Sequence, residues 1–165
     1  MKLAIQNSNT SWTLNWIKFC KSNNINFVIL DLYRSDAINL LIKNSITHLI
    51  WHIHHGIPQD ILMARNVIFS AKQLNIKVFP NIETCWHYDD KISQKYILEA
   101  LGVNFASTYV FYSKFSALEW LKKRLKYLLV VKLRRGAGSY NVQLIKNYTQ
   151  GKKYVIKMFG SGINP

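Results

Sequence analysis

The chain has 165 residues, of which 49% are hydrophobic and 13% aromatic, so it can bury a core and is not an intrinsically disordered segment. Its 22 basic and 8 acidic side chains give a formal net charge of +14, which favours anionic partners. The lysines are scattered, and the densest basic run, residues 122–126, is most simply the solvated side of a helix, so nucleic acid is disfavoured as the partner.

The first 80 residues alternate between short apolar runs and helical patterns. The apolar runs predict four strands, over residues 2–7, 26–33, 47–53 and 75–80. Capping residues and apolar spacing predict the intervening helices, over residues 8–24 and 36–43 and from Pro58 onwards. The expected fold is therefore α/β: an open, doubly wound parallel sheet of the Rossmann-like kind, which binds ligands at the carboxyl ends of its strands.

Residues 81–165 are expected to form a small α+β lobe. Asp89 and Asp90 predict the start of a helix that ends at Gly102. Further along, the patterns predict a strand over 107–112, a helix over 116–126, strands over 127–133 and 141–147, and a helix start at Gly151. The last two strands are predicted to pair as an antiparallel hairpin. The domain boundary is expected near residue 80.

The tip of this hairpin combines basic residues with glycines. The residues that could hold an anion there are Lys132, Arg134, Arg135, Gly136, Ala137, Gly138 and Ser139. Glycines let backbone amides approach an anion, a lysine adds a point charge, and arginines can clamp phosphate oxygens. The alternative is a plain glycine hairpin with exposed basic side chains, and the residues alone leave both interpretations open. The loop is not a P-loop, because its lysine precedes the glycines and it joins two strands.

The order of these motifs resembles the ATP-grasp ligase family. The stretch FPNIETCWHYDDK lies about forty residues before the strand, lysine and glycine loop. In this resemblance Lys91 corresponds to the family's lysine at the start of a helix, and Lys132 to its lysine at the end of a strand. Residues 136–139 correspond to the glycine-rich loop that covers the nucleotide phosphates, and residues 79–81 to the connection between domains. The resemblance covers the chain from Met1 to Pro165.

The resemblance implies a pre-ATP-grasp domain in residues 1–80 and the first lobe of an ATP-grasp domain in residues 81–165. It implies ATP as the ligand, with Lys91 and Lys132 on the α- and β-phosphates and loop amides over the β- and γ-phosphates. In the complete enzyme a small carboxylate substrate would be phosphorylated to an acylphosphate, which an amine or a thiol attacks.

The same resemblance implies that the chain is the amino-terminal half of such a ligase. The family holds Mg²⁺ with acidic residues of a second lobe, whereas after Asp90 the only acidic residues are Glu99 and Glu119, and neither follows Lys132. We therefore expect Mg²⁺ only with that second lobe, no catalytic residue in this chain, and no ligase activity from the chain alone. The alternative is a non-catalytic interaction module, or a degenerate fragment, that pairs with another chain or with a second copy.

Three histidines, His52, His54 and His55, follow the third predicted strand. We favour ordinary strand-end histidines over contacts with an anionic co-substrate. Metal binding ranks last: His52 and His54 would share one face of a strand, but no neighbouring cysteine or carboxylate completes a site, and no metal site is assigned.

The sequence predicts a cytoplasmic protein without a membrane association. Its first twelve residues lack the pattern of a signal peptide, and no apolar run approaches the roughly 18 residues of a membrane span. Cys20 and Cys85 lie far apart without metal or redox spacing, so both are expected to be reduced thiols.

Overall fold

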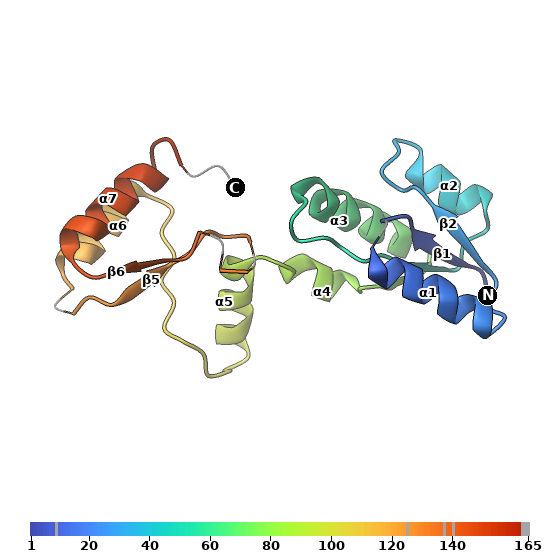
Figure 1. Ribbon diagram of the computed structural model, residues 1–165, viewed down its shortest axis with the longest axis horizontal. Helices are drawn as coiled ribbons and strands as arrows, with labels where there is room; N and C mark the ends of the chain where they lie inside the picture. Colours follow the sequence, from blue (N-terminus) through green and yellow to red (C-terminus); the bar gives the residue numbers. More distant parts are fainter. Residues whose placement is uncertain (9, 125, 137, 140, 163–165) are drawn as a thin grey trace. The chain divides into compact units, whose positions relative to one another are not determined.

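The computed structural model describes residues 1–8, 10–124, 126–136, 138–139 and 141–162 (Figure 1). The chain forms two compact units: unit 1, Met1–Tyr88, and unit 2, Asp89–Pro165. The division falls after Tyr88 rather than near residue 80, because α4 (Ile82–His87) packs against α3 (Pro58–Gln73) and so belongs to unit 1.

Unit 1 is built around a four-stranded parallel sheet with strand order β2-β1-β3-β4. The strands are β1 (Leu3–Gln6), β2 (Phe27–Leu30), β3 (His48–Ile50) and β4 (Lys77–Phe79). In β1, Leu3 pairs with Phe27 of β2 on one side and with His48 of β3 on the other. The predicted parallel α/β sheet is thus confirmed, and β1 and β3 are the neighbours at which the strand order reverses.

Helices cover both faces of this sheet (Figure 1). The remaining helices are α1 (Ser11–Ser22) and α2 (Ala37–Lys43). Ala4 joins buried residues of α2 and α3 in the main hydrophobic core, whereas Ile5 points to the opposite face and is also fully buried. Each helix begins where the sequence offers a start signal, such as the Thr10 cap of α1 and Pro58 at the first turn of α3.

The described residues of unit 2 form a two-stranded antiparallel sheet and three helices. The elements are α5 (Lys91–Ala100), α6 (Lys114–Lys122), β5 (Leu129–Val131), β6 (Gln143–Ile145) and α7 (Tyr148–Met158). Val130 lies opposite Leu144, which confirms the predicted hairpin. The helix expected from Gly151 already begins at Tyr148, where Asn147 caps its first turn, so Gly151 lies inside α7.

The strand predicted over residues 107–112 is wrong. The rings of Tyr109 and Phe111 instead pack on Trp120 of α6, at centroid distances of 4.6 and 5.3 Å. The Arg124 guanidinium lies 4.3 Å from the Trp120 ring centroid and adds a cation–π contact. Aromatic and β-branched residues favour strands in general, but here the two rings pack against a helix and the segment forms no strand ladder.

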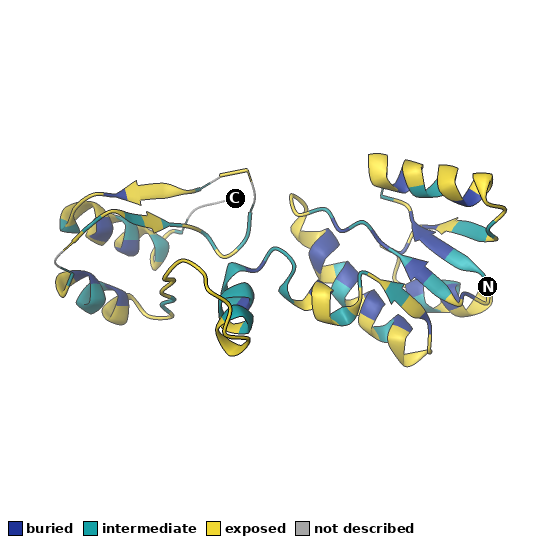
Figure 2. Cartoon of the chain, turned by 90° about the horizontal axis from the view of Figure 1, so that it is seen from below, coloured by how far each residue is buried: buried dark blue, intermediate teal, exposed yellow. Residues whose placement is uncertain are grey.

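The two faces of the β5–β6 sheet differ in how far the described residues of unit 2 cover them. Ile145 is fully buried, and a Cβ added to Gly151 would lie 3.1 Å from both terminal carbons of Leu121, so α6, α7 and the sheet are in close contact there. On the other face Val130 and Leu144 are 56% and 45% exposed. Figure 2 shows exposed positions on both strands, next to intermediate positions on β5 and a buried one on β6.

Candidate functional site

The start of α5 and the tip of the β5–β6 hairpin meet at Asp90. One carboxylate oxygen, Oδ1, accepts hydrogen bonds from the backbone amides of Ile92 and Ser93, both at 3.1 Å, and caps the helix. The other, Oδ2, accepts from Nε of Arg134 at 2.8 Å and from its Nη2. Asp90 is 1% exposed, so this pair joins two segments that are 44 residues apart at a buried carboxylate.

The electrostatics of Asp90 follow from these bonds. Burial by itself raises the pKa of a carboxyl group, but the hydrogen bonds from Arg134 and Ser93 outweigh it and lower the pKa of Asp90 to about 2. The same contact raises the pKa of Arg134. The pair is therefore ionised at neutral pH.

Lys91 and Asp89 make the next contacts between the same two segments. The Lys91 amide donates to the carbonyl oxygen of Arg134 at 3.0 Å, and its Nζ donates to that of Gly136 at 2.6 Å. The Asp89 carboxylate accepts from the Gly136 amide, with Oδ1 and Oδ2 at 3.1 and 3.0 Å. Lys91, Arg134 and Gly136, which the sequence selects separately, are thus in direct contact.

The other described residues that were selected in the loop differ in exposure and backbone conformation. Lys132 is exposed and directly follows β5, two positions after the exposed Val130. Gly136 and Gly138 have φ angles of 110° and 63°, the left-handed region that glycine adopts most easily. Arg135 is half-buried and Ser139 exposed, whereas Ala137 lies outside the described residues.

The three histidines of unit 1 have different partners. Because β3 ends at Ile50, all three lie in the following loop, where the alternation of a strand no longer applies. The ring of His52 stacks on Trp12 at a centroid distance of 5.8 Å, whereas His54 stacks on His55 at 5.4 Å. Burial lowers the pKa of His52, whose Nδ1 is buried without a hydrogen-bond partner among the described residues.

Asp60, in the first turn of α3, is a polar residue that contacts this loop, and it is not among the site residues predicted from the sequence. Its carboxylate is fully buried, with Oδ1 accepting from Nε1 of Trp51 at 2.7 Å and Oδ2 from the amide of His54 at 2.5 Å. Burial, together with a hydrogen bond to Asp60, also raises the pKa of Tyr33. The sequence signal for Asp60 was an acidic residue two positions after a proline that starts a helix. That signal does not reveal which groups of the preceding loop donate hydrogen bonds to the carboxylate.

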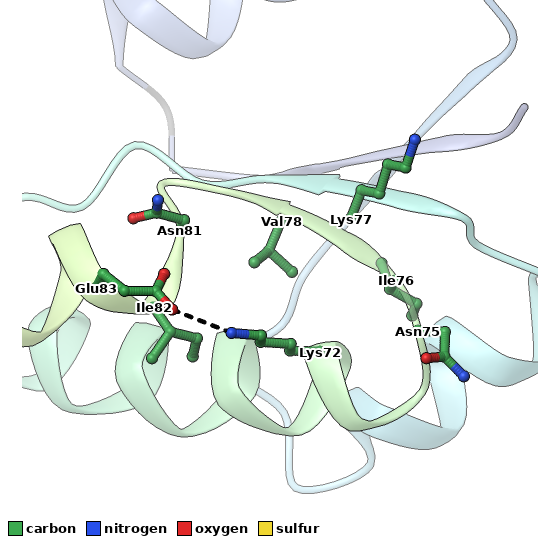
Figure 3. Close-up of a pocket in the computed structure, with 8 residues that line it drawn as sticks. All are labelled: Lys72, Asn75, Ile76, Lys77, Val78, Asn81, Ile82 and Glu83. Carbon is green, nitrogen blue, oxygen red and sulfur yellow. Dashed lines mark hydrogen bonds and ion pairs between the residues drawn. The ribbon is translucent and has the colours of Figure 1, made fainter.

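Two open pockets in unit 1 lie apart from these residues. The larger, of about 450 Å³, runs along β4 and the end of α3 beside the Lys72–Glu83 ion pair (Figure 3). The smaller, of about 290 Å³, lies between α3 and α4. None of the predicted site residues lines either one.

Within the described ranges, no group of three or more histidine, cysteine, aspartate or glutamate residues could hold a metal ion. Among the same residues no helix has the length and apolar character needed to cross a membrane.

Comparison with known proteins gives a fold relationship rather than a sequence match. No protein-family model matches the chain, and no curated protein matches it. Among solved structures it is similar to N5-carboxyaminoimidazole ribonucleotide synthetase from Thermotoga maritima, with a TM-score of 0.58 and 17% identity over 92% of this chain and 42% of the other. It is also similar to D-alanine–D-alanine ligase from Bacillus anthracis, with a TM-score of 0.60 and 17% identity over 96% of this chain and 54% of the other.

Both of these enzymes are ATP-grasp ligases. The chain spans about half the length of each, and the similarity extends over both of its units. The relationship predicted from the two lysines and the glycine loop is therefore confirmed at the level of the fold: this chain has the fold found in the corresponding part of ATP-grasp ligases.

Proposed function

We propose that the chain is the ATP-binding half of an ATP-grasp ligase that joins a carboxylate to an amine or a thiol. Unit 1 would be the pre-ATP-grasp domain and unit 2 the first lobe of the ATP-grasp domain. The observation that carries the proposal is the contact between Lys91 Nζ and the Gly136 carbonyl at 2.6 Å, on a fold similar to two ATP-grasp ligases. This contact places a cation against a glycine loop across 45 residues of sequence.

The residues of unit 2 suit a polyphosphate. Lys91 and Lys132 would neutralise the α- and β-phosphates, while the amides of residues 136–139 would donate hydrogen bonds to the β- and γ-phosphates. Arg135 would add a charged donor. Arg134 already binds Asp90, so its first role is to hold the loop against α5, and any phosphate contact would come in addition.

The remaining components of the reaction would come from outside this chain. Mg²⁺, when bound by a second lobe, would neutralise charge on the β- and γ-phosphates during transfer to the carboxylate. The histidine loop after β3 lies at the carboxyl end of the parallel sheet, the usual ligand side of such sheets, and would contact the carboxylate substrate through His52, His54 or His55. Cytoplasmic ATP would be the nucleotide source.

A second candidate function is a non-catalytic module that pairs with another chain or with a second copy. The exposed apolar face of the β5–β6 sheet favours it, because Val130 and Leu144 would be buried by such a partner.

The two functions differ in their response to nucleotide. We expect Mg-ATP at about a hundred times its Kd to stabilise the chain by about 2.7 kcal/mol in thermal unfolding. Lys132→Ala should remove this gain, because it deletes a proposed phosphate contact. The side chain is exposed, so its loss should not disturb the fold. Lys146→Ala is the matched control, since it removes an exposed lysine just after β6, at the other end of the hairpin. Equal stabilisation of all three proteins, or none of the wild type, would contradict the nucleotide site.

A further inference from the structure

An internal carboxylate already occupies the glycine loop. Both oxygens of Asp89 lie within hydrogen-bonding distance of the Gly136 amide, at 3.1 and 3.0 Å. The Asp89 side chain is only 9% exposed, so the contact is shielded from water. Phosphate-binding loops bind the oxygens of their ligand through such backbone amides. The Asp89 carboxylate therefore stands where a phosphate oxygen would be bound.

The cation next to this amide is engaged in the same way. Lys91 Nζ donates to the Gly136 carbonyl at 2.6 Å and lies 3.8 Å from Oδ1 of Asp89. The negative charge of Asp89 thus neutralises part of the positive charge that would attract a polyphosphate. An amide and a cation suited to phosphate both have internal partners in this structure.

We propose that Asp89 is an internal competitor of the nucleotide and sets the affinity of the loop for polyphosphates. A phosphate that binds the Gly136 amide and Lys91 must displace the carboxylate from both. This inference rests on the proposed function. It adds Asp89, a residue that weakens phosphate binding, to the residues that provide that binding. Asp90, its neighbour, has a different role, since its oxygens are used by the helix cap and by Arg134.

The test uses the whole chain with two substitutions of Asp89. Asp89→Asn removes the charge and keeps the side-chain size, and Asp89→Gly removes the side chain; both residues tolerate the φ of 47° at this position. Glu119→Gln is the matched control, because it removes one negative charge from unit 2 at a surface pair with Lys122. Isothermal titration with tripolyphosphate and with Mg-ATP gives the dissociation constants.

We expect Asp89→Asn and Asp89→Gly to bind tripolyphosphate about tenfold more tightly than the wild type, and Glu119→Gln to stay within about twofold of it. Unchanged or weaker binding by Asp89→Asn would overturn the inference, since Asp89 would then organise the loop for its ligand. If the wild type binds through Lys132 and Asp89→Asn binds equally, this inference alone fails. If neither the wild type nor Asp89→Asn binds either probe at millimolar concentration, the proposed function fails with it.

Discussion

Replacing Arg134 by methionine should destabilise unit 2 and leave unit 1 unchanged. The substitution keeps an unbranched apolar side chain but removes the guanidinium that donates to Asp90. The Asp90 carboxylate, which is 1% exposed in the wild type, would lose its charged partner, and the two helix-capping amides would still donate to it. Breaking a fully buried pair costs about 3–5 kcal/mol, but the Arg134 side chain is 57% exposed, so water would replace part of the interaction.

The pKa of Asp90, which both Arg134 and Ser93 lower, gives a second magnitude. A fall from 3.8 to about 2 corresponds to about 2 kcal/mol of stabilisation at neutral pH. This contribution is fully present above the unfolded-state value of 3.8 and is lost as the pH falls through the folded-state value of about 2. We therefore expect Arg134→Met to cost about 2 kcal/mol at pH 7 and roughly half of that at pH 3.

Hydrogen exchange during urea titration, read by mass spectrometry, measures this loss separately for peptides of each unit. Arg135→Met is the matched control, because the adjacent arginine has no ion pair among the described residues. A loss below about 0.5 kcal/mol at pH 7, an equal loss at pH 3, or the same effect from the control would each refute the reasoning.

Three further predictions concern other parts of the molecule. Asp60→Ala should cost unit 1 about 2–4 kcal/mol in urea unfolding, since it leaves the Trp51 indole and the His54 amide without their acceptor; a loss like that from the exposed Asp36→Ala would contradict this. Gly151→Ala should cost unit 2 about 1 kcal/mol by crowding Leu121, and it should cost less in a chain that already carries Leu121→Ala; an equal cost in both backgrounds would exclude the steric cause. The pKa of His52 is lowered in the folded chain, so the stability of unit 1 should decline as the pH falls below 6.5, where protonation of His52 favours the unfolded state. His52→Phe should remove this decline in pH-dependent unfolding, and an unchanged profile would assign the decline to other groups.

Much of unit 1 could be predicted because its signals are local. Four apolar runs separated by capped helices imply a parallel sheet, and all four strands lie within the predicted ranges. The short helix α4 was missed because six residues contain too little periodicity to be recognised. In unit 2 the segment 107–112 was assigned from strand propensity, but packing on Trp120 determines its structure.

Candidate site residues could be selected from the sequence, but the contacts between them could not. Lys91 and the glycine loop were selected from motif order, and in the structure Lys91 Nζ donates to the Gly136 carbonyl. The ion pair between Asp90 and Arg134 joins residues that are 44 positions apart, so it depends on the tertiary fold. A helix-capping aspartate has the same local sequence pattern with or without such a partner. Asp89 and Asp60 could not be distinguished from ordinary acidic residues for the same reason.

The hydrogen bond from the Lys91 amide to the Arg134 carbonyl has a consequence for how the chain can vary in length. Residues 101–128, between α5 and β5, are not needed to set the distance between these two backbone groups, because the contact itself sets it. Residues 101–109 are exposed, and doubling the length of such a loop costs only about 0.6 kcal/mol in closure entropy. Insertions in this stretch should therefore leave the spacing between the lysine and the glycine loop unchanged.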